Sequence, residues 1–210
     1  MPTCEEIRAA VGKYNTDNSV DDDALKSALG PIQGAPRSFG RILAEVCLVA
    51  DWGTIQFFSF RDRVLTAREI EASLAILDPM RSLHDEDFNA ETKLLSDALD
   101  KLPSSLLTVP GKRQLSFLSK YLHTCVNDAF PIWDNNARNA LGYDDDEKTW
   151  PSYKKWLLVV RSEVTVHKTC CLDDVASPAE CLVRTLDKAL YTIGAPKTSP
   201  LPASGSNRKP

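Results

Sequence analysis

Lys120 and Asp134 are the residues whose types and positions could support chemistry. The lysine lies 14 positions before the aspartate, and the stretch "YLHTCVNDAFPIW" separates them. At 100° per residue, the apolar side chains of 112–127 share one helical face, and Lys120 falls on the other. An exposed lysine on an amphipathic helix is the commonest explanation for such a residue. An amine at the edge of a polar site is the alternative.

Asp134 precedes a short amphipathic segment, 135–141, which ends at Gly142, a usual helix stop. A carboxylate at this N-cap position accepts backbone N–H hydrogen bonds, and the helix dipole favours its negative charge. That role is sufficient to explain the residue. The same surroundings would also keep a catalytic carboxylate ionised and oriented, so the sequence leaves both roles open.

Two segments carry a resemblance to a known superfamily. The first, "PGKRQLSFLSKYLHTCVNDAFPIWDNNARNAL", residues 110–141, resembles part of the helix-hairpin-helix DNA glycosylases. In that part, a hairpin bearing proline and glycine leads into a helix, and a connector bearing proline and aspartate opens the next. The second is "RTLDKALYTIG", residues 184–194. Together with "SKYLH" and "FPIWD", it is similar to small bacterial proteins distantly related to that superfamily.

The resemblance implies a DNA glycosylase-like protein that cleaves the N-glycosidic bond of a flipped, damaged or modified base. In the family an aspartate at the start of this helix stabilises the positive charge that develops on the deoxyribose, and Asp134 matches that position. In members with lyase activity a lysine near the hairpin attacks C1′ and forms a Schiff base. Lys112 and Lys120 both remain candidates. The alternative function is a noncatalytic all-helical protein-interaction module that retains the fold.

The expected DNA contacts are Gly111, Lys112 and Arg113, where a helix N-terminus would suit a phosphate. A single glycine stands where the family usually has a G-x-G turn. Trp133 is the candidate for stacking on a flipped base, with the buried core as its more ordinary place. The net charge of −4 and pI near 5.4 argue against a broad polyanion-binding surface. The expected partner is therefore duplex DNA through a local basic patch, or another protein.

Helix signals dominate the chain, so we expect an all-α fold: one compact multi-helix domain over 1–194, or alternatively two helical lobes. Thr3, Thr66 and Ser177 each precede a glutamate by three residues, which is the capping-box pattern. A strand-like run, 54–60, is a minor element. Residues 195–210, rich in Pro and Ser, predict a disordered tail. The expected helices lie near 3–14, 21–29, 37–51, 66–77, 88–101, 112–127, 135–141, 150–164 and 178–193, with the third, sixth, eighth and ninth forming the core.

The six cysteines are too few for a disulfide scaffold of this size, and we expect them to be reduced and mostly buried in a cytoplasmic protein. The family's iron–sulfur pattern is absent. The residues that could bind zinc lack the usual C-x₂₋₄-C pairing, so we expect no metal and no cofactor. These residues are His167, Cys170, Cys171 and Cys181.

The longest aliphatic run, "LLVV" at 157–160, is much shorter than a membrane span of about 18 residues. The N-terminal residues "MPTCEEIRAAVG" carry acidic groups where a secretory signal has positive charge, and no apolar segment follows. We therefore expect neither secretion nor a membrane partner.

Overall fold

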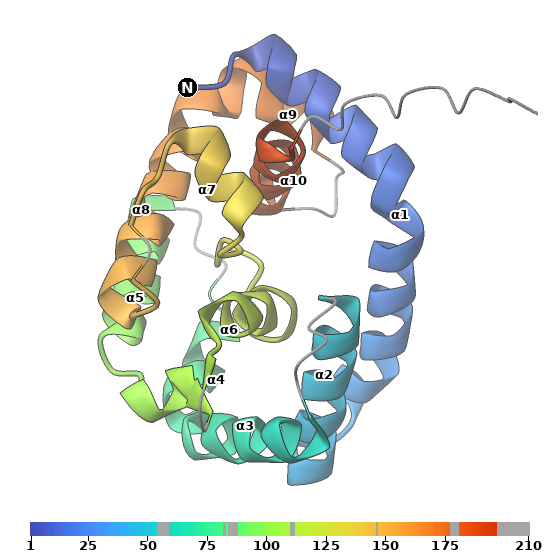
Figure 1. Ribbon diagram of the computed structural model, residues 1–210, viewed down its shortest axis with the longest axis vertical. Coiled ribbons are helices and arrows are strands. Elements are labelled where there is room, and N and C mark those ends of the chain that lie inside the picture. The colour runs from blue at the N-terminus through green and yellow to red at the C-terminus, as the bar shows by residue number, and fades with distance from the viewer. Residues whose placement is uncertain are drawn as a thin grey trace, which may run out of the picture.

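The computed structural model is all-α, as expected (Figure 1). It describes residues 1–53, 59–81, 83, 88–109, 112–145, 147–176 and 181–196, without the side chains of Ser19, Val109, Lys112 and Arg113. The α-helices of this part are α1 (Cys4–Gly34), α2 (Phe39–Trp52), α3 (Phe60–Ala72), α4 (Leu74–Arg81), α5 (Phe88–Leu99), α6 (Leu115–Tyr121), α7 (Asn135–Leu141), α8 (Trp150–His167), α9 (Asp173–Val175) and α10 (Leu182–Gly194).

Shorter elements connect these helices. The 3₁₀ turn η1 (Ser104–Leu107) precedes a two-residue strand, β1 (Thr108–Val109), which pairs antiparallel with β2 (Lys112–Arg113). Two π-helical turns follow longer helices: η2 (Leu122–Val126) continues α6, and η3 (Lys168–Leu172) continues α8. The hairpin of β1 and β2 takes the place of the expected first turn of helix 112–127.

The long helix α1 begins at a capping box, as predicted. Thr3 Oγ1 accepts a hydrogen bond from the Glu6 N–H at 3.3 Å, and the Glu6 carboxylate accepts one from the Thr3 N–H at 2.8 Å. Two separate helices were expected over 3–14 and 21–29. They form one helix because the polar residues between them include neither Gly nor Pro, so nothing stops the hydrogen-bond ladder.

The capping box predicted at Thr66 is wrong, because Thr66 lies inside α3, fully buried, and its hydroxyl donates to Gln114 at 3.3 Å. The box at the start of α3 is formed instead by Ser59 and Asp62. The capping box predicted at Ser177, most of the strand-like run 54–60 and all of the tail beyond residue 196 lie outside the described residues.

Helices α6 and α10 lie inside a rim formed by α1, α3 and α8 in the view of Figure 1. Buried apolar residues from α1 through α10 join in one hydrophobic cluster. The four expected core segments all contribute, as α2, α6 with η2, α8 and α10. None of the described helices combines the length and apolarity that crossing a membrane requires.

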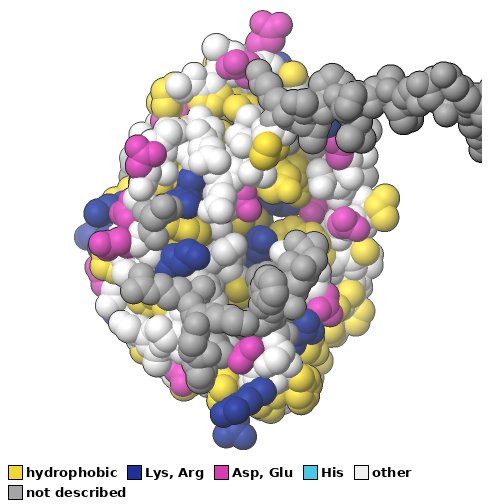
Figure 2. All heavy atoms as spheres, viewed as in Figure 1, with side chains coloured by type: hydrophobic (Ala, Val, Ile, Leu, Met, Phe, Trp, Pro, Cys, Tyr) yellow, Lys and Arg dark blue, Asp and Glu magenta, His cyan; other side chains and the backbone are white. Residues whose placement is uncertain are grey.

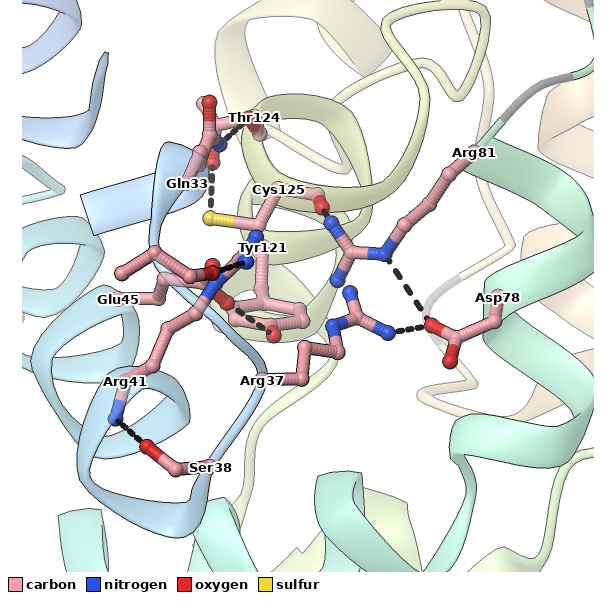
Figure 3. Close-up of polar contacts among 11 residues, drawn as sticks. Gln33, Arg37, Ser38, Arg41, Glu45, Asp78, Arg81, Tyr121, Thr124 and Cys125 are labelled. Atoms are coloured by element: carbon pink, nitrogen blue, oxygen red, sulfur yellow. Dashed lines mark hydrogen bonds and ion pairs between the residues drawn. The ribbon is translucent and has the colours of Figure 1, made fainter. Parts of the chain in front are cut away.

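A buried carboxylate links α2 to α6 (Figure 3). Glu45 on α2 is fully buried, and its two oxygens accept hydrogen bonds from Arg41 Nε at 3.0 Å and Tyr121 Oη at 2.8 Å. Burial raises the pKa of the Tyr121 hydroxyl well above its usual value, with Cys125 and Glu45 adding to the rise. Both oxygens of Glu45 are thus used within the fold, which assigns this group to structure.

A second polar group in the same region joins α4 to η2. In Figure 3 the guanidinium groups of Arg37 and Arg81 both point toward Asp78, and Arg81 also donates to the Cys125 carbonyl. Burial lowers the pKa of Arg37, and the neighbouring charge of Arg81 lowers it further. The Arg81 bond to the Cys125 carbonyl fixes α4 against the turn that follows α6, and the Arg37–Asp78 pair joins α4 to the segment before α2.

Replacing Glu45 by Gln tests the first of these links. We expect the free energy of unfolding to fall by roughly 1–3 kcal/mol, because a buried hydrogen bond to Arg41 loses its charge. Urea unfolding of the variant should be compared with Glu71→Gln, a matched change at an exposed position on α3. Equal stability of the two variants would contradict a structural role for Glu45.

Candidate functional site

A cavity of about 220 Å³ lies between α1, the end of α2, α6, the connector 130–134 and α10. Lys120 and Asp134, the two residues that the sequence singled out, both line it. Figure 2 shows that the surface is hollowed near the middle of the face drawn, where Lys or Arg and Asp or Glu side chains lie close together. The fold thus brings the predicted amine and the predicted carboxylate to one cavity.

Lys120 reaches the cavity from the last turn of α6. Its side chain is half-buried, its Nζ donates to the Gly53 carbonyl at 3.4 Å, and it lies 6.0 Å from the centre of the Trp52 ring. Burial lowers the pKa of the Lys120 amine, while the charge of Asp134 opposes that change. More of this amine is therefore neutral at a given pH than for an exposed lysine, and only the neutral form is a nucleophile.

Asp134 is the N-cap of α7, as predicted, and its Oδ1 accepts a hydrogen bond from the Asn136 N–H at 2.7 Å. The helix ends at Gly142, which has the left-handed φ of 62° that favours glycine. The aspartate is also half-buried and lines the cavity. Asp134 therefore both caps α7 and lines the cavity.

The connector before Asp134 has no regular secondary structure, but side chains of α8 hold its carbonyl groups. Tyr153 Oη donates to the Pro131 carbonyl at 2.7 Å, and Trp156 Nε1 donates to the Ile132 carbonyl at 3.1 Å. All of these residues are buried. A connector held in this way has one conformation, which fixes the direction in which the chain enters α7.

Side chains of α6 and α10 hold the N–H groups of the same connector. Ser119 Oγ accepts from the Trp133 N–H at 2.8 Å, and Asp187 Oδ2 accepts from the Ile132 N–H at 3.0 Å. Helix α10 can approach because its last residue is Gly194, where an added Cβ would stand 1.7 Å from the Asn136 carbonyl oxygen. The position of the site carboxylate is thus determined by α6, α8 and α10 together.

Asp187 is a cavity residue that the sequence interpretation missed. Only 3% of it is exposed, and its Oδ1 has no hydrogen-bond partner among the described residues. Burial raises the pKa of the Asp187 carboxyl to about 7, against the opposing effects of the Ile132 N–H and Arg184. A signal was present in "RTLDKALYTIG", since Asp187 falls among the apolar positions of a strongly amphipathic helix.

Because the pKa of Asp187 is raised, we expect the effect of Asp187→Asn on protein stability to depend on pH. Between its usual pKa of 3.8 and about 7, the unfolded chain releases this proton and the folded chain keeps it, so the carboxyl costs stability as pH rises. The amide of Asn does not titrate and can still accept from the Ile132 N–H. We expect Asn to stabilise the protein at pH 8 by roughly 1–3 kcal/mol relative to wild type, and by much less at pH 4.

Urea unfolding of both proteins at pH 4, 6 and 8 measures this difference. Asp97→Asn, at an exposed position on α5, serves as the matched control and should show no such trend. A stability difference for Asp187→Asn that is the same at all three pH values would contradict the prediction.

One side of the cavity is closed by an ion pair between α10 and α1. Arg184 donates to Asp22 at 2.7 Å and to Tyr14 Oη at 2.9 Å, and Trp52 Nε1 donates to the other oxygen of Asp22 at 3.3 Å. A second cavity of about 300 Å³ lies against the same pair. Arg184 and Asp22 are thus engaged with each other, which leaves Lys120 as the lining cation with the weaker protein contacts.

The aromatic surface of the cavity comes from Tyr14, Trp52 and Tyr191. Tyr191 is 40% exposed and meets the ring of Tyr14 edge-on, with centroids 5.9 Å apart. Trp133, the residue expected to stack on a base, is instead 2% exposed in the core, with the Arg138 guanidinium 4.8 Å from its ring centre. Trp133 therefore offers no free face, and Trp52 and Tyr191 replace it as candidates for stacking.

Lys112 and Arg113 do not occupy the expected helix N-terminus. They form β2, and α6 begins two residues later at Leu115. Gly111 and the side chains of Lys112 and Arg113 lie outside the described residues, so their DNA contacts and the second candidate nucleophile stay predictions. Over the coloured part of the face in Figure 2, Lys and Arg side chains are interspersed with Asp and Glu.

The expectation that all cysteines are reduced is wrong for one pair, because the Sγ atoms of Cys4 and Cys170 are bonded at 2.12 Å. Burial raises the pKa of Cys125 and of Cys181 to about 12, so these two thiols stay protonated and unreactive. Cys47 is half-buried. None of the cavity-lining residues is a cysteine.

Comparison of the chain with family models, with curated proteins and with solved structures gives no match. Any function proposed for the protein must therefore rest on the chemistry of the cavity. Four of its lining residues carry carboxyl groups and two carry cationic groups: Asp21, Asp22, Asp134 and Asp187, with Lys120 and Arg184. Such a lining disfavours a bound phosphate and favours a ligand that is, or becomes, positively charged.

Proposed function

We propose that the protein is a DNA glycosylase-like enzyme that cleaves the N-glycosidic bond of a flipped, damaged or modified base. The observation that carries this proposal is the pairing of Lys120 and Asp134 in one cavity. An amine of lowered pKa is suited to attack a carbon, and a carboxylate beside it is suited to a developing positive charge. The resemblance of residues 110–141 to the helix-hairpin-helix glycosylases is consistent with these roles.

The proposed reaction begins with the lone pair of the neutral Lys120 Nζ, which forms a bond to C1′ of the flipped nucleotide. The bond from C1′ to the base breaks, and the base leaves with that electron pair and takes up a proton. Asp134 stabilises the positive charge on the sugar as this bond breaks. Nζ then loses a proton, and its lone pair forms the C1′=Nζ double bond of the Schiff base as the C1′–O4′ bond breaks. The ring oxygen O4′ takes up the released proton, so the sugar ring opens to an alcohol.

The surroundings of the two groups support their roles. The connector before Asp134 is held by buried hydrogen bonds from three helices, so the carboxylate needs little reorganisation before reaction. The free Oδ1 of Asp187 is available to a polar edge of the base or sugar. Trp52 and Tyr191 supply aromatic surface at the same cavity, as flipped bases commonly require.

Borohydride trapping tests the proposal directly. The purified chain is incubated with duplex oligonucleotides that each carry one lesion, drawn from oxidised purines, alkylated purines, oxidised pyrimidines and uracil. We expect reduction to give a covalent protein–DNA adduct on at least one substrate. Strand cleavage after alkali, measured in parallel, detects base excision that proceeds without a Schiff base.

The absence of both adduct and alkali-dependent cleavage across the whole set would overturn the proposal. That result would instead favour the noncatalytic interaction module. Excision without an adduct would retain the glycosylase and assign the attack on C1′ to water, with Asp134 still stabilising the sugar. An undamaged duplex of the same sequence is the control in every reaction.

A further inference from the structure

Four side chains of the types that bind zinc meet at the N-terminal end of α1. The residues of α1 that line the cavity come later in the helix. Cys4 begins α1, His167 ends α8, and Cys170 and Cys171 lie in η3. One ligand atom from each, three Sγ atoms and a histidine nitrogen, lies within 4.8 Å of all the others. Two segments separated by more than 160 residues thus present three sulfurs and an imidazole to one point.

The separations suit tetrahedral coordination. With Zn–S near 2.3 Å and Zn–N near 2.1 Å, neighbouring ligands in a tetrahedron stand roughly 3.6–3.8 Å apart. His167 Nδ1 lies 3.8 Å from Cys4 Sγ and 3.6 Å from Cys170 Sγ, and Cys170 Sγ lies 3.6 Å from Cys171 Sγ. The bonded pair, Cys4 and Cys170, is the one that must separate to admit an ion.

The second ring nitrogen of His167 provides independent support. His167 Nε2 is buried and lies 3.5 Å from Oε2 of Glu163, and neither atom has a hydrogen-bond partner among the described residues. A carboxylate opposite Nε2 favours the tautomer with the proton on that nitrogen, which leaves the Nδ1 lone pair for a metal. Histidines that bind metals are commonly oriented by a carboxylate in this way.

The charge around the cluster is also compatible with a cation and thiolates. Three thiolates and a neutral imidazole around Zn²⁺ have a total charge of −1. Arg8 of α1 donates to the Cys170 carbonyl at 2.7 Å and to Asp174 at 2.7 Å, which places a guanidinium beside the cluster. Asp174 neutralises part of this charge, and the guanidinium lies closest to the backbone of Cys170.

We propose that the reduced chain binds one Zn²⁺ through the Sγ atoms of Cys4, Cys170 and Cys171 and through His167 Nδ1. Opening of the Cys4–Cys170 bond gives two thiols and takes two electrons from a reductant. A thiol reductant also supplies the two protons and becomes a disulfide, whereas a phosphine becomes the phosphine oxide and water supplies the oxygen and both protons. Zinc then displaces three thiol protons as it binds. With four protein ligands the site is closed, which is the arrangement of structural rather than catalytic zinc.

The site would tie the first turn of α1 to the end of α8. Helix α1 also carries Tyr14 and Asp22, which contact Arg184 at the wall of the candidate cavity. Zinc binding in the reduced chain would therefore hold the N-terminal helix in place against α10. This inference does not depend on the proposed reaction, because it concerns ligands that do not line that cavity.

A metal titration of the full chain tests the proposal. The protein is reduced with a phosphine, freed of metal with a chelator and titrated with Co²⁺. We expect one Co²⁺ per chain, the intense visible absorption of tetrahedral cobalt and thiolate charge-transfer bands, all removed by one equivalent of Zn²⁺. Zinc should also raise the melting temperature of the reduced chain.

Variants at Cys171 and His167 separate a metal site from a simple disulfide, because neither residue belongs to the Cys4–Cys170 bond. Cys171→Ser and His167→Asn should each weaken Zn²⁺ binding by more than 100-fold, and Glu163→Gln by roughly 10- to 100-fold. Cys47→Ser, a half-buried cysteine outside the cluster, is the matched control and should bind as wild type does.

Failure of the reduced wild-type chain to bind Co²⁺ or Zn²⁺ would overturn the proposal, as would wild-type affinity in Cys171→Ser. If a ligand variant does not fold, the zinc dependence of the wild-type melting temperature decides instead. If the reduced wild-type chain melts at the same temperature with zinc and with chelator, the zinc proposal is rejected. The role of the four side chains is then limited to the Cys4–Cys170 disulfide.

Discussion

Asp134→Asn is expected to keep the fold and to lose base excision by roughly 10²- to 10³-fold. The Asn side chain can still accept the Asn136 N–H, so the N-cap of α7 is preserved. The negative charge is lost, and with it the stabilisation of a cationic sugar. Thermal melts and single-turnover excision rates, on a lesion identified by trapping, measure the two consequences separately.

Asp134→Ala is the informative companion. It should lose a similar amount of activity and, in addition, roughly 1 kcal/mol of stability, because alanine cannot cap the helix. A catalytic requirement therefore affects both variants, whereas a purely structural one affects only Ala. Full activity in Asp134→Asn would reduce the aspartate to a capping residue.

Lys120→Gln is expected to abolish the borohydride adduct, since the amide has no lone pair that can attack C1′. Its folding should be nearly unchanged, because the contacts of the Lys120 amine with described residues are weak: a long hydrogen bond to Gly53 and a distance of 6.0 Å to the Trp52 ring centre. Lys93→Gln, at an exposed position on α5, should form the adduct as wild type does. Adduct yield by gel shift, with circular dichroism to confirm folding, is the measurement.

The pH dependence of trapping gives a second readout for the same lysine. Burial lowers the pKa of the Lys120 amine below 10.5, so adduct formation in wild type should rise with pH and level off below the value expected for an exposed lysine. An adduct that persists in Lys120→Gln would assign the nucleophile to another amine, with Lys112 as the remaining candidate from the sequence.

Local signals in the sequence were sufficient to predict much of the fold and part of the site. Asp134 and Gly142 delimit α7 because capping and left-handed φ are properties of a few neighbouring residues. The amphipathic pattern of 112–127 predicted the helical segment that the structure has over α6 and η2, but not that its first residues form β2. It could not predict that the segment changes to the π-helical turn η2, where the Asn127 N–H reaches back to the Leu122 carbonyl at 2.8 Å.

The rest depends on contacts between distant segments. The position of Asp187 on an amphipathic helix signals burial, but its partner, the Ile132 N–H 55 positions earlier, depends on how α10 packs against the connector. The sequence left Trp133 between a stacking role and the core, and the α8 side chains that pack around it place it in the core. From the sequence, His167, Cys170 and Cys171 were grouped with Cys181, and the missing C-x₂₋₄-C pairing led us to expect no metal. The structure instead places Cys4, 163 positions before His167, beside them. Spacing rules capture local pairs of ligands and miss a ligand supplied by the other end of the chain.

The side-chain bonds to the connector have a consequence during synthesis on the ribosome. When residues 115–141 have emerged, Lys120 and Asp134 are both present, but Tyr153, Trp156 and Asp187, which hold the connector between them, have yet to emerge. The lysine of the nascent chain is then an ordinary solvated ammonium group. The burial that lowers the pKa of Lys120 is complete only when α10 docks beside α1 and α7, so the amine keeps its usual pKa until translation has passed the last described helix.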